Sequence, residues 1–139
     1  MPAVDQCQEK IVRALQKEGW QVRAAPYRLL SDYRYGYADV ELSRGTNGNR
    51  ELIMLIEIKC FPGEGSTTSD LYEAIGQYLI YRAMIFDATL PHTLYLAVPE
   101  DKYSDIFDPI VIQVVNESHI KIVIVNLETE MVVRWIETP

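Results

Sequence analysis

Two stretches of the chain repeat apolar residues every three or four positions, the spacing of a helix with one buried face. The first predicts a helix over residues 5–18 that stops at Gly19. Asp5 and Gln8 have the spacing of a capping box at its start. The second stretch predicts a helix over residues 70–86. Its expected buried stripe comprises Leu71, Ile75, Tyr78, Leu79 and Phe86.

Shorter stretches alternate apolar and polar residues, which is the pattern of a strand with one buried face. The strands predicted in this way are an outer one that ends before Pro26, residues 35–42, residues 93–99, and a hairpin or two short strands within residues 120–137. Residues 51–60 are apolar on both faces, which predicts a central strand that is covered on each side. Asn47-Gly48 predicts a tight hairpin turn before that strand.

Residues 101–117 fit a helix that starts at a proline as well as they fit a strand. With that segment left open, the order of elements predicts a mixed β-sheet flanked by helices. The chain has 139 residues, about the usual size of one domain, so we expect a single α/β domain over residues 1–139. No apolar run approaches the roughly 18 residues that span a membrane, and the N-terminal residues lack a signal-peptide pattern. A cytoplasmic protein without a membrane partner is therefore expected.

Charge is distributed unevenly along the chain. The formal net charge is −7, but residues 1–59 carry +1 and residues 60–139 carry −8. An acidic surface repels the phosphate backbone of nucleic acids, so a nucleic-acid site would have to lie on the N-terminal half. The acidic half fits a protein partner better.

The two cysteines, Cys7 and Cys60, lie far apart in the sequence. Neither has a neighbour at the spacing of a metal-binding motif. We therefore expect two reduced thiols in packing roles and no disulfide between them.

Glu57 and Lys59 share one face at the end of the central strand, where a buried strand gains little from charged residues. One interpretation is a structural salt bridge. The other is a metal site, because Asp39 in the preceding strand could bring a second carboxylate beside Glu57. Two carboxylates and the carbonyl of Ile58 would offer the oxygen ligands that Mg²⁺ prefers. Lys59 would then hold a phosphate oxygen or orient the attacking water.

The register of the hairpin decides whether Asp39 can reach Glu57. A two-residue turn at Asn47-Gly48 pairs positions whose numbers sum to 95, which places Asp39 opposite Ile56 and on the wrong face. The site needs a sum of 96, which an odd-length loop or a bulge would supply. The sequence leaves this choice open.

Five ordered motifs, "PYRLL", "YADVEL", "IEIKCF", "DLYEAIGQYLIYRA" and "LYLAVP", closely resemble the XisH family, the fdxN element excision controlling factors of cyanobacteria. The resemblance runs over nearly the whole chain and implies the restriction-endonuclease-like fold of the PD-(D/E)XK nucleases. It places that motif's acidic residues on Asp39 and Glu57 and its lysine on Lys59. It also implies a helix within residues 101–117.

The resemblance extends to weaker positions. Gln77 and Tyr81 match a Gln-x-x-x-Tyr motif that follows the catalytic strand in some nucleases of this fold, which implies a catalytic role for Gln77. Tyr81 fits equally a packing residue with its hydroxyl at the surface. Glu9 matches a first-helix glutamate that helps to hold the metal in related nucleases, with a solvated surface side chain as the alternative. Arg28 either contacts phosphate or pairs with a carboxylate of the site.

Three functional hypotheses follow. The first is an endonuclease dependent on Mg²⁺ or Mn²⁺ that acts on DNA during programmed excision, as the resemblance implies. The second is a catalytically inactive accessory protein that kept the nuclease fold and binds a XisI-like partner, the companion that the family implies. The third is a domain whose charged pair is only structural. The sequence gives no sign of whether the chain forms a homo-oligomer.

Overall fold

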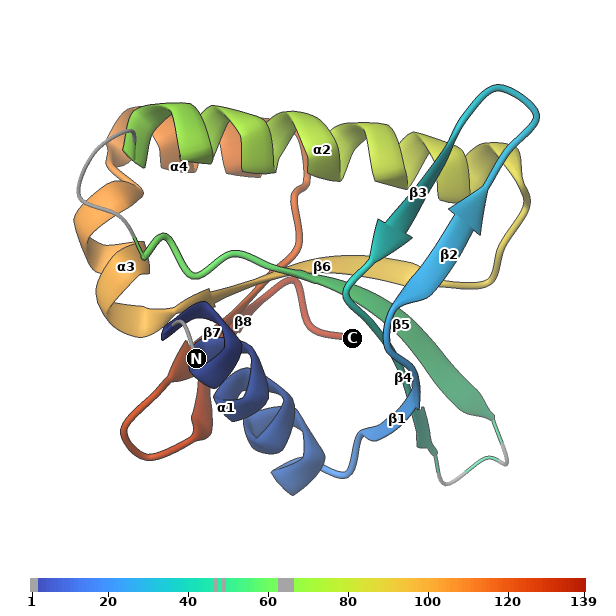
Figure 1. The fold of residues 1–139 in the computed structure, drawn as a ribbon, viewed down its shortest axis with the longest axis horizontal. Coiled ribbons are helices and arrows are strands. Elements are labelled where there is room, and N and C mark those ends of the chain that lie inside the picture. The colour runs from blue at the N-terminus through green and yellow to red at the C-terminus, as the bar shows by residue number, and fades with distance from the viewer. Residues whose placement is uncertain (1–2, 47, 49, 63–66) are drawn as a thin grey trace.

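A mixed sheet runs through the middle of the protein (Figure 1). Its strands stand in the order β1 (Gln21–Ala24), β4 (Val40–Gly45), β5 (Glu51–Ile58), β6 (Thr93–Pro99), β7 (Ile122–Asn126) and β8 (Met131–Ile136). The structure is a computed structural model that describes residues 3–46, 48, 50–62 and 67–139, with side chains from residue 6 onward. The pairs β5–β6 and β6–β7 are parallel, and the other neighbouring pairs are antiparallel.

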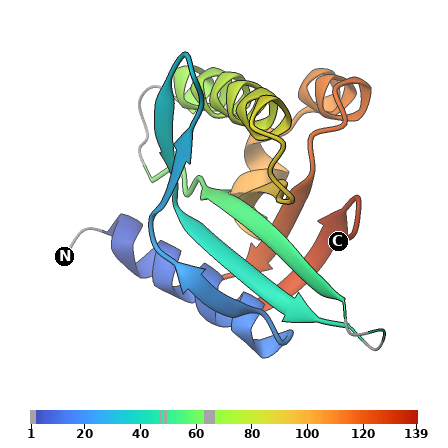
Figure 2. The ribbon, with the colours of Figure 1, turned by 90° about the vertical axis from the view of Figure 1, so that its right-hand side faces the viewer.

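Helices cover both faces of this sheet, as Figure 2 shows from the side. The helix α1 (Ala3–Lys17) packs on one face. The helices α2 (Thr67–Asp87), α3 (Glu100–Ile106) and α4 (Pro109–Glu117) pack on the other. The central strand β5 is buried between the two layers, which confirms the expected α/β architecture. Among the described residues, none of the helices is both long and apolar enough to cross a membrane.

The helix predictions hold in kind and need correction in detail. The first helix starts before Asp5, at Ala3, so the predicted capping box does not mark its beginning. On α2, Leu71 and Tyr78 are buried as predicted, but Phe86 is 87% exposed. A helix turns by about 100° per residue, so Ile85 stays in line with Tyr78 while Phe86 lies roughly 80° away from it.

Residues 101–117 are helical, which settles the ambiguous segment. A break at Phe107 separates α3 from α4. The side chain of Asp108 accepts a hydrogen bond from the N–H of Val111 at 2.9 Å, and Pro109 occupies the first helical position. The Asp108 cap and Pro109 therefore start α4, in agreement with the predicted alternative of a helix that starts at a proline.

A second, two-stranded sheet was missed by the sequence analysis. The strands β2 (Tyr27–Leu30) and β3 (Tyr35–Ala38) form an antiparallel hairpin beside the C-terminal half of α2 (Figures 1 and 2). The strand expected over residues 35–42 is therefore divided at Asp39, where the chain passes from the hairpin into the main sheet. A Cβ atom on Gly36 would lie 2.6 Å from the hydroxyl of Tyr81, so the absence of a side chain at Gly36 lets the hairpin approach α2.

The register between β4 and β5 is the one that the candidate site requires. Val40 pairs with Ile56 and Gly45 pairs with Glu51, so the paired positions sum to 96. The connecting residues 46–50 close through the N–H of Thr46, which donates to the carbonyl of Arg50 at 2.8 Å. The predicted Asn47-Gly48 turn falls partly outside the described residues, because Asn47 is not among them.

Cys7 and Cys60 form a disulfide, so the expectation of two reduced thiols was wrong. Their Cα atoms lie 6.4 Å apart although 53 positions separate them in the sequence. The cause is the packing of α1, because the side chains of Ile56, Ile58 and Cys60 point toward the face of the sheet that α1 covers. The spacing of the two cysteines along the chain could not predict that packing, and so could not predict the disulfide.

Candidate active site

The candidate site lies where β5 ends. Successive side chains of β5 point to opposite faces, so Leu55 and Glu57 face α2 while Ile56 and Ile58 face α1. Asp39 immediately precedes β4, its carboxylate reaches the N–H of Ile58 at the end of β5, and its charge raises the pKa of Glu57. The structure therefore brings the two predicted carboxylates together at the edge where the main sheet meets the hairpin.

Asp39 is held in place by main-chain groups of the neighbouring strand. Its Oδ2 accepts a hydrogen bond from the N–H of Ile58 at 2.7 Å. Its own N–H donates to the carbonyl of Ile56 at 3.1 Å. In an antiparallel pair the N–H and C=O of one residue point to the same side, so the carbonyl of Ile58 also lies on the side of Asp39.

Lys59 completes the cluster. Its Nζ lies 3.9 Å from Oε2 of Glu57, and its side chain is 24% exposed against 5% for that of Glu57. The N–H of Lys59 donates to the carbonyl of Ala97 at 2.9 Å, which keeps this residue aligned with β6 beyond the end of β5. The ammonium group is thus the more accessible member of the pair, on a backbone that the sheet fixes.

Glu57 carries an unsatisfied oxygen. Its Oε1 is buried and has no hydrogen-bond partner among the described residues. A buried carboxylate oxygen without a donor or a cation is costly, and such atoms in folded proteins call for an explanation. An ion pair with Lys59 does not supply one, because that contact is made at the limit of an ion-pair distance and to the other oxygen.

Both carboxyl groups are harder to ionise than usual. Burial, and then the nearby charge of Asp39, raise the pKa of Glu57 to about 7, while Lys59 and the main-chain amide of Asp39 act in the opposite direction. Burial also raises the pKa of Asp39, against the lowering effect of the Ile58 N–H and of Lys59. Two neighbouring carboxylates predict shifts in this direction, although desolvation contributes more than their mutual repulsion.

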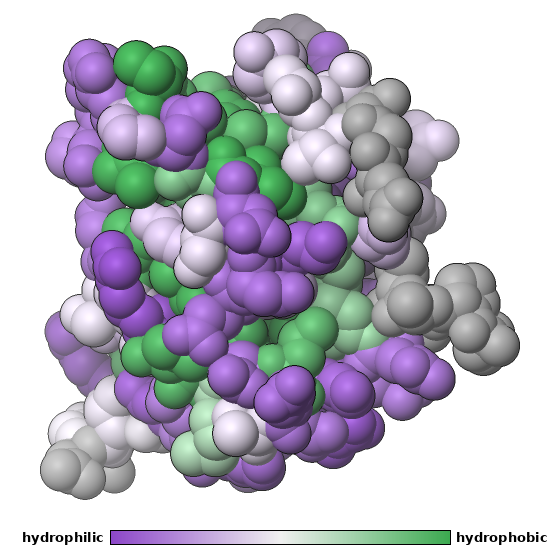
Figure 3. All heavy atoms as spheres, turned by 90° about the vertical axis from the view of Figure 1, so that its left-hand side faces the viewer, coloured by the Kyte–Doolittle hydropathy of each residue, from purple (hydrophilic) through white to green (hydrophobic). Residues whose placement is uncertain are grey.

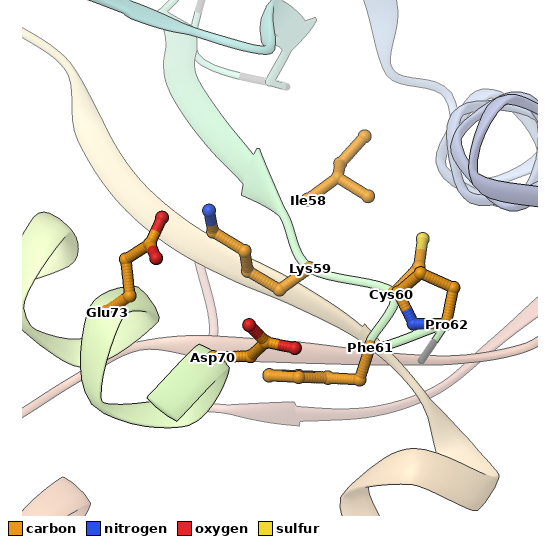
Figure 4. A pocket seen from close by; sticks show the side chains of 7 residues that line it. All are labelled: Ile58, Lys59, Cys60, Phe61, Pro62, Asp70 and Glu73. Atoms are coloured by element: carbon orange, nitrogen blue, oxygen red, sulfur yellow. The ribbon is translucent and has the colours of Figure 1, made fainter. Parts of the chain in front are cut away.

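A pocket of about 350 Å³ opens beside Lys59, between the end of β5 and the first turns of α2. Figure 4 shows the ammonium group of Lys59 and the carboxylate of Glu73 directed toward one another across it. Asp70 lies next to Phe61 in the same pocket. The lining of this pocket therefore combines one cation with two carboxylates.

Gln77 and Tyr81 follow on the same helix. The amide nitrogen of Gln77 donates to the hydroxyl of Tyr81 at 3.3 Å, and that hydroxyl accepts from the N–H of Tyr37 at 3.3 Å. Tyr81 therefore attaches the hairpin to α2, which is a packing role for a half-buried side chain. The amide oxygen of Gln77 is buried without a hydrogen-bond partner among the described residues.

Glu9 is not brought to this cluster. It lies on α1, which covers the opposite face of the sheet from Glu57, and its side chain is 70% exposed and 3.9 Å from Arg13. In the part of the chain that the structure describes, no three His, Cys, Asp or Glu side chains gather closely enough to hold a metal ion. A metal at this site would therefore be held by Asp39, Glu57 and main-chain oxygen, without Glu9.

A model of the XisH protein family matches residues 1–133. The chain belongs to the XisH family. Among curated proteins, none matches it. The XisH chain is 25% identical to a fdxN element excision controlling factor protein from Anabaena variabilis, whose crystal structure superposes with a TM-score of 0.83 over 96% of this chain and 99% of that one. An XisH family protein from Nostoc punctiforme PCC 73102 is also 25% identical, with a TM-score of 0.83 over 95% and 99% of the two chains.

Two acidic residues of this XisH protein were missed as members of the site. Asp70 and Glu73 were not assigned to the site from the sequence, yet both line the pocket beside Lys59. Their spacing carries a usable signal, because positions 70, 73 and 77 fall on one ridge of a helix. Gln77, already a candidate, thus marked the ridge on which the two acids lie.

Proposed function

We propose that this XisH protein is a nuclease that depends on Mg²⁺ or Mn²⁺ and cleaves phosphodiester bonds in DNA. The observation that carries the proposal is the buried Oε1 of Glu57, which lacks a partner in the described structure and lies beside a second carboxylate. A divalent cation would offset the mutual repulsion of Asp39 and Glu57 and the cost of their burial. Under this proposal the fold is that of the PD-(D/E)XK nucleases, with Asp39, Glu57 and Lys59 as its motif.

The residues present fit a hard divalent cation. Asp39, Glu57 and the carbonyl of Ile58 would hold it, since all three offer oxygen ligands on one side of the strand end. When bound, the ion supplies Lewis-acid activation of water and charge neutralisation at the phosphate. Lys59 positions the attacking water or stabilises the charge that develops on the phosphate oxygens. Gln77 orients a ligand through the free oxygen of its amide.

The biological setting is proposed from the relatives. The Anabaena variabilis protein is described as a fdxN element excision controlling factor. A nuclease that acts on DNA during the excision of an inserted element would agree both with that description and with the chemistry of the candidate site. Cleavage would then be one step in the control of excision, carried out beside the enzymes that rejoin the strands.

A second candidate function is a non-catalytic accessory protein that binds a XisI-like partner. Exposed apolar side chains favour it, because Phe86 is 87% and Ile80 46% exposed on α2. A shallow pocket of about 320 Å³ lies next to Ile80 and is also lined by Ala83 and Met84. Such a surface fits a protein partner, either a XisI-like chain or a second copy of this one.

Calorimetric titration with Mn²⁺ and plasmid nicking test the first proposal. Wild-type protein should bind Mn²⁺ and nick supercoiled DNA only when the ion is present. Glu57→Gln and Asp39→Asn should lose both properties. Glu128→Gln removes the same charge from an exposed turn and should keep both.

The proposal fails if the wild-type chain, alone and mixed with a XisI-like protein, neither binds Mn²⁺ nor nicks DNA. Light scattering of the same mixtures measures the mass of any complex. A stable complex that Phe86→Ala disrupts, together with the absence of nicking, would establish the accessory function instead. The chain measured alone reports whether it forms a homo-oligomer.

A further inference from the structure

The outer face of the β2–β3 hairpin is unusually aromatic. The inner face places Leu29 and Ala38 in the core that α2 covers, so the alternate residues point outward. The exposed fractions on the outer side are 57% for Leu30, 65% for Tyr35 and 50% for Tyr37, and Tyr33 in the connecting turn is 87% exposed. Large exposed aromatic side chains that gather on one face mark a binding surface more often than chance.

This surface is held in one conformation. The hydroxyl of Ser31 accepts hydrogen bonds from the N–H groups of Tyr33 at 3.2 Å and Arg34 at 3.1 Å, which fixes the turn. At the other end, the hydroxyl of Tyr81 accepts from the N–H of Tyr37 and fixes the hairpin to α2. The tyrosines are therefore presented on a ribbon that is hydrogen-bonded at both ends, which lowers the cost of ordering it when a ligand binds.

The rings and the cations are interleaved. The rings of Tyr35 and Tyr37 meet edge to face with centroids 6.3 Å apart. The guanidinium carbon of Arg28 lies 5.6 Å from the centre of the Tyr35 ring. Arg34 in the turn adds a second exposed guanidinium. Aromatic faces for bases beside guanidinium groups for phosphates are the combination found in proteins that bind single-stranded nucleic acids.

The hairpin runs directly into the candidate active site. Tyr37 precedes Asp39 by two positions, a distance of roughly 7 Å along an extended strand. Figure 1 shows β3 ending where β4 and the end of β5 come together. A polynucleotide stacked along β3 would thus end close to Asp39 and the end of β5.

The face at the left of Figure 1 argues against a duplex as the ligand. Hydrophilic side chains gather in the middle of that face, with smaller apolar patches beside and below them (Figure 3). Acidic residues on α3 and on the turn between β7 and β8 lie at that end. Two arginines on the hairpin are few for neutralising the phosphates of a double helix. Bases in a duplex are already stacked on one another, whereas unpaired bases have free faces for tyrosine.

We infer that the outer face of the β2–β3 hairpin binds unpaired nucleotides by stacking on Tyr33, Tyr35 and Tyr37. One consequence of this inference rests on the proposed nuclease function: the protein should prefer to cleave DNA that contains a single-stranded segment next to the scissile bond. Arg28, whose role the sequence left open, is assigned to the phosphates of that segment. Binding itself needs neither metal nor cleavage.

Fluorescence anisotropy with a labelled oligothymidylate of about 15 nucleotides, in EDTA and in the Glu57→Gln background, tests binding apart from chemistry. Tyr35→Ala and Tyr37→Ala should each raise Kd by about tenfold, the loss expected for one stacked base. Tyr35→Phe keeps the ring and should bind like the parent protein. Tyr72→Ala removes an equally exposed tyrosine, 68% exposed on α2, and should also leave Kd unchanged.

The outcomes separate this inference from the proposed function. Tyrosine-dependent oligonucleotide binding in a protein that never binds Mn²⁺ would uphold the hairpin surface and refute the nuclease. Metal-dependent nicking that is equal on duplex and gapped DNA, with Kd values unchanged in Tyr35→Ala and Tyr37→Ala, would refute the hairpin surface and leave the nuclease standing. If those two substitutions instead dissociate a complex with protein, the surface is a protein interface and the inference is overturned.

Discussion

Replacing Glu57 by Gln should make the protein more stable at neutral and alkaline pH when no metal is present. Gln has the size of Glu and carries no charge, so the substitution removes the cost of burying a carboxylate. The pKa of Glu57 is raised from 4.5 to about 7 in the folded protein. Each unit of such a shift corresponds to about 1.4 kcal/mol, so the ionised side chain costs about 3 kcal/mol of folding free energy.

The pH dependence gives this prediction its sign. A raised folded-state pKa means that the folded protein retains the proton to a higher pH than the unfolded chain does. The wild type therefore loses no stability from Glu57 below pH 4.5 and loses progressively more as the pH rises to about 7, after which the loss is constant. The advantage of Glu57→Gln should be below about 0.5 kcal/mol at pH 4.5 and about 3 kcal/mol at pH 8, or about 10 °C in Tm for a chain of this length.

Urea unfolding at the two pH values, in EDTA and without reductant, measures this difference. Glu128→Gln serves as the control, because Glu128 is exposed and its loss should change the free energy of unfolding by less than about 0.5 kcal/mol. Adding Mn²⁺ at pH 8 should stabilise the wild type and leave Glu57→Gln unaffected. If Glu57→Gln is instead less stable than the wild type by several kcal/mol at pH 8, then Lys59 is a sufficient partner for Glu57 and the metal hypothesis loses its basis.

Three more predictions concern the framework of the site. Gly36→Ala should lower the free energy of unfolding by about 1–3 kcal/mol, because its Cβ would overlap the Tyr81 ring. In urea unfolding of the double mutant, Tyr81→Phe should recover part of this loss. A Gly36→Ala variant as stable as the wild type would contradict the close approach. Cys7→Ser should lower the free energy of unfolding by about 4 kcal/mol, the value expected for a cross-link over 53 positions, and reductant should destabilise only the wild type. Tyr78→Phe should lower the free energy of unfolding, measured by thermal unfolding, by about 1–3 kcal/mol. The buried hydroxyl of Tyr78 bridges the carbonyl of Leu94 and the N–H of Lys121. Stability equal to the wild type would show that these two groups find other partners.

Local patterns predicted most of the main sheet and its helices. The strand over residues 51–60 is apolar on both faces, and a strand with that composition has to be covered on both sides, as β5 is. The hairpin was missed because the alternation through Tyr37, Asp39 and Glu41 is unbroken. A change of sheet at Asp39 bends the backbone without disturbing the polarity pattern, so period alone cannot detect it.

The candidate site was predictable in its residue types and less so in its environment. Asp39, Glu57 and Lys59 stand out because charged residues end a buried strand. The bond from the Ile58 N–H to Asp39 and the unpaired oxygen of Glu57 depend on tertiary packing, which no spacing in the sequence encodes. The disulfide from Cys60 was missed for the same reason, since it follows from where α1 docks.

The register between β4 and β5 ties the candidate site to a distant part of the protein. The two carboxylates lie close together at one end of the strand pair, while the connection over residues 46–50 joins the other end. Surface connections usually tolerate a residue gained or lost. Here a change of one would slide β4 against β5 and turn Asp39 toward α1, away from Glu57. The number of residues between β4 and β5 is thus as much a determinant of their meeting as the acids themselves.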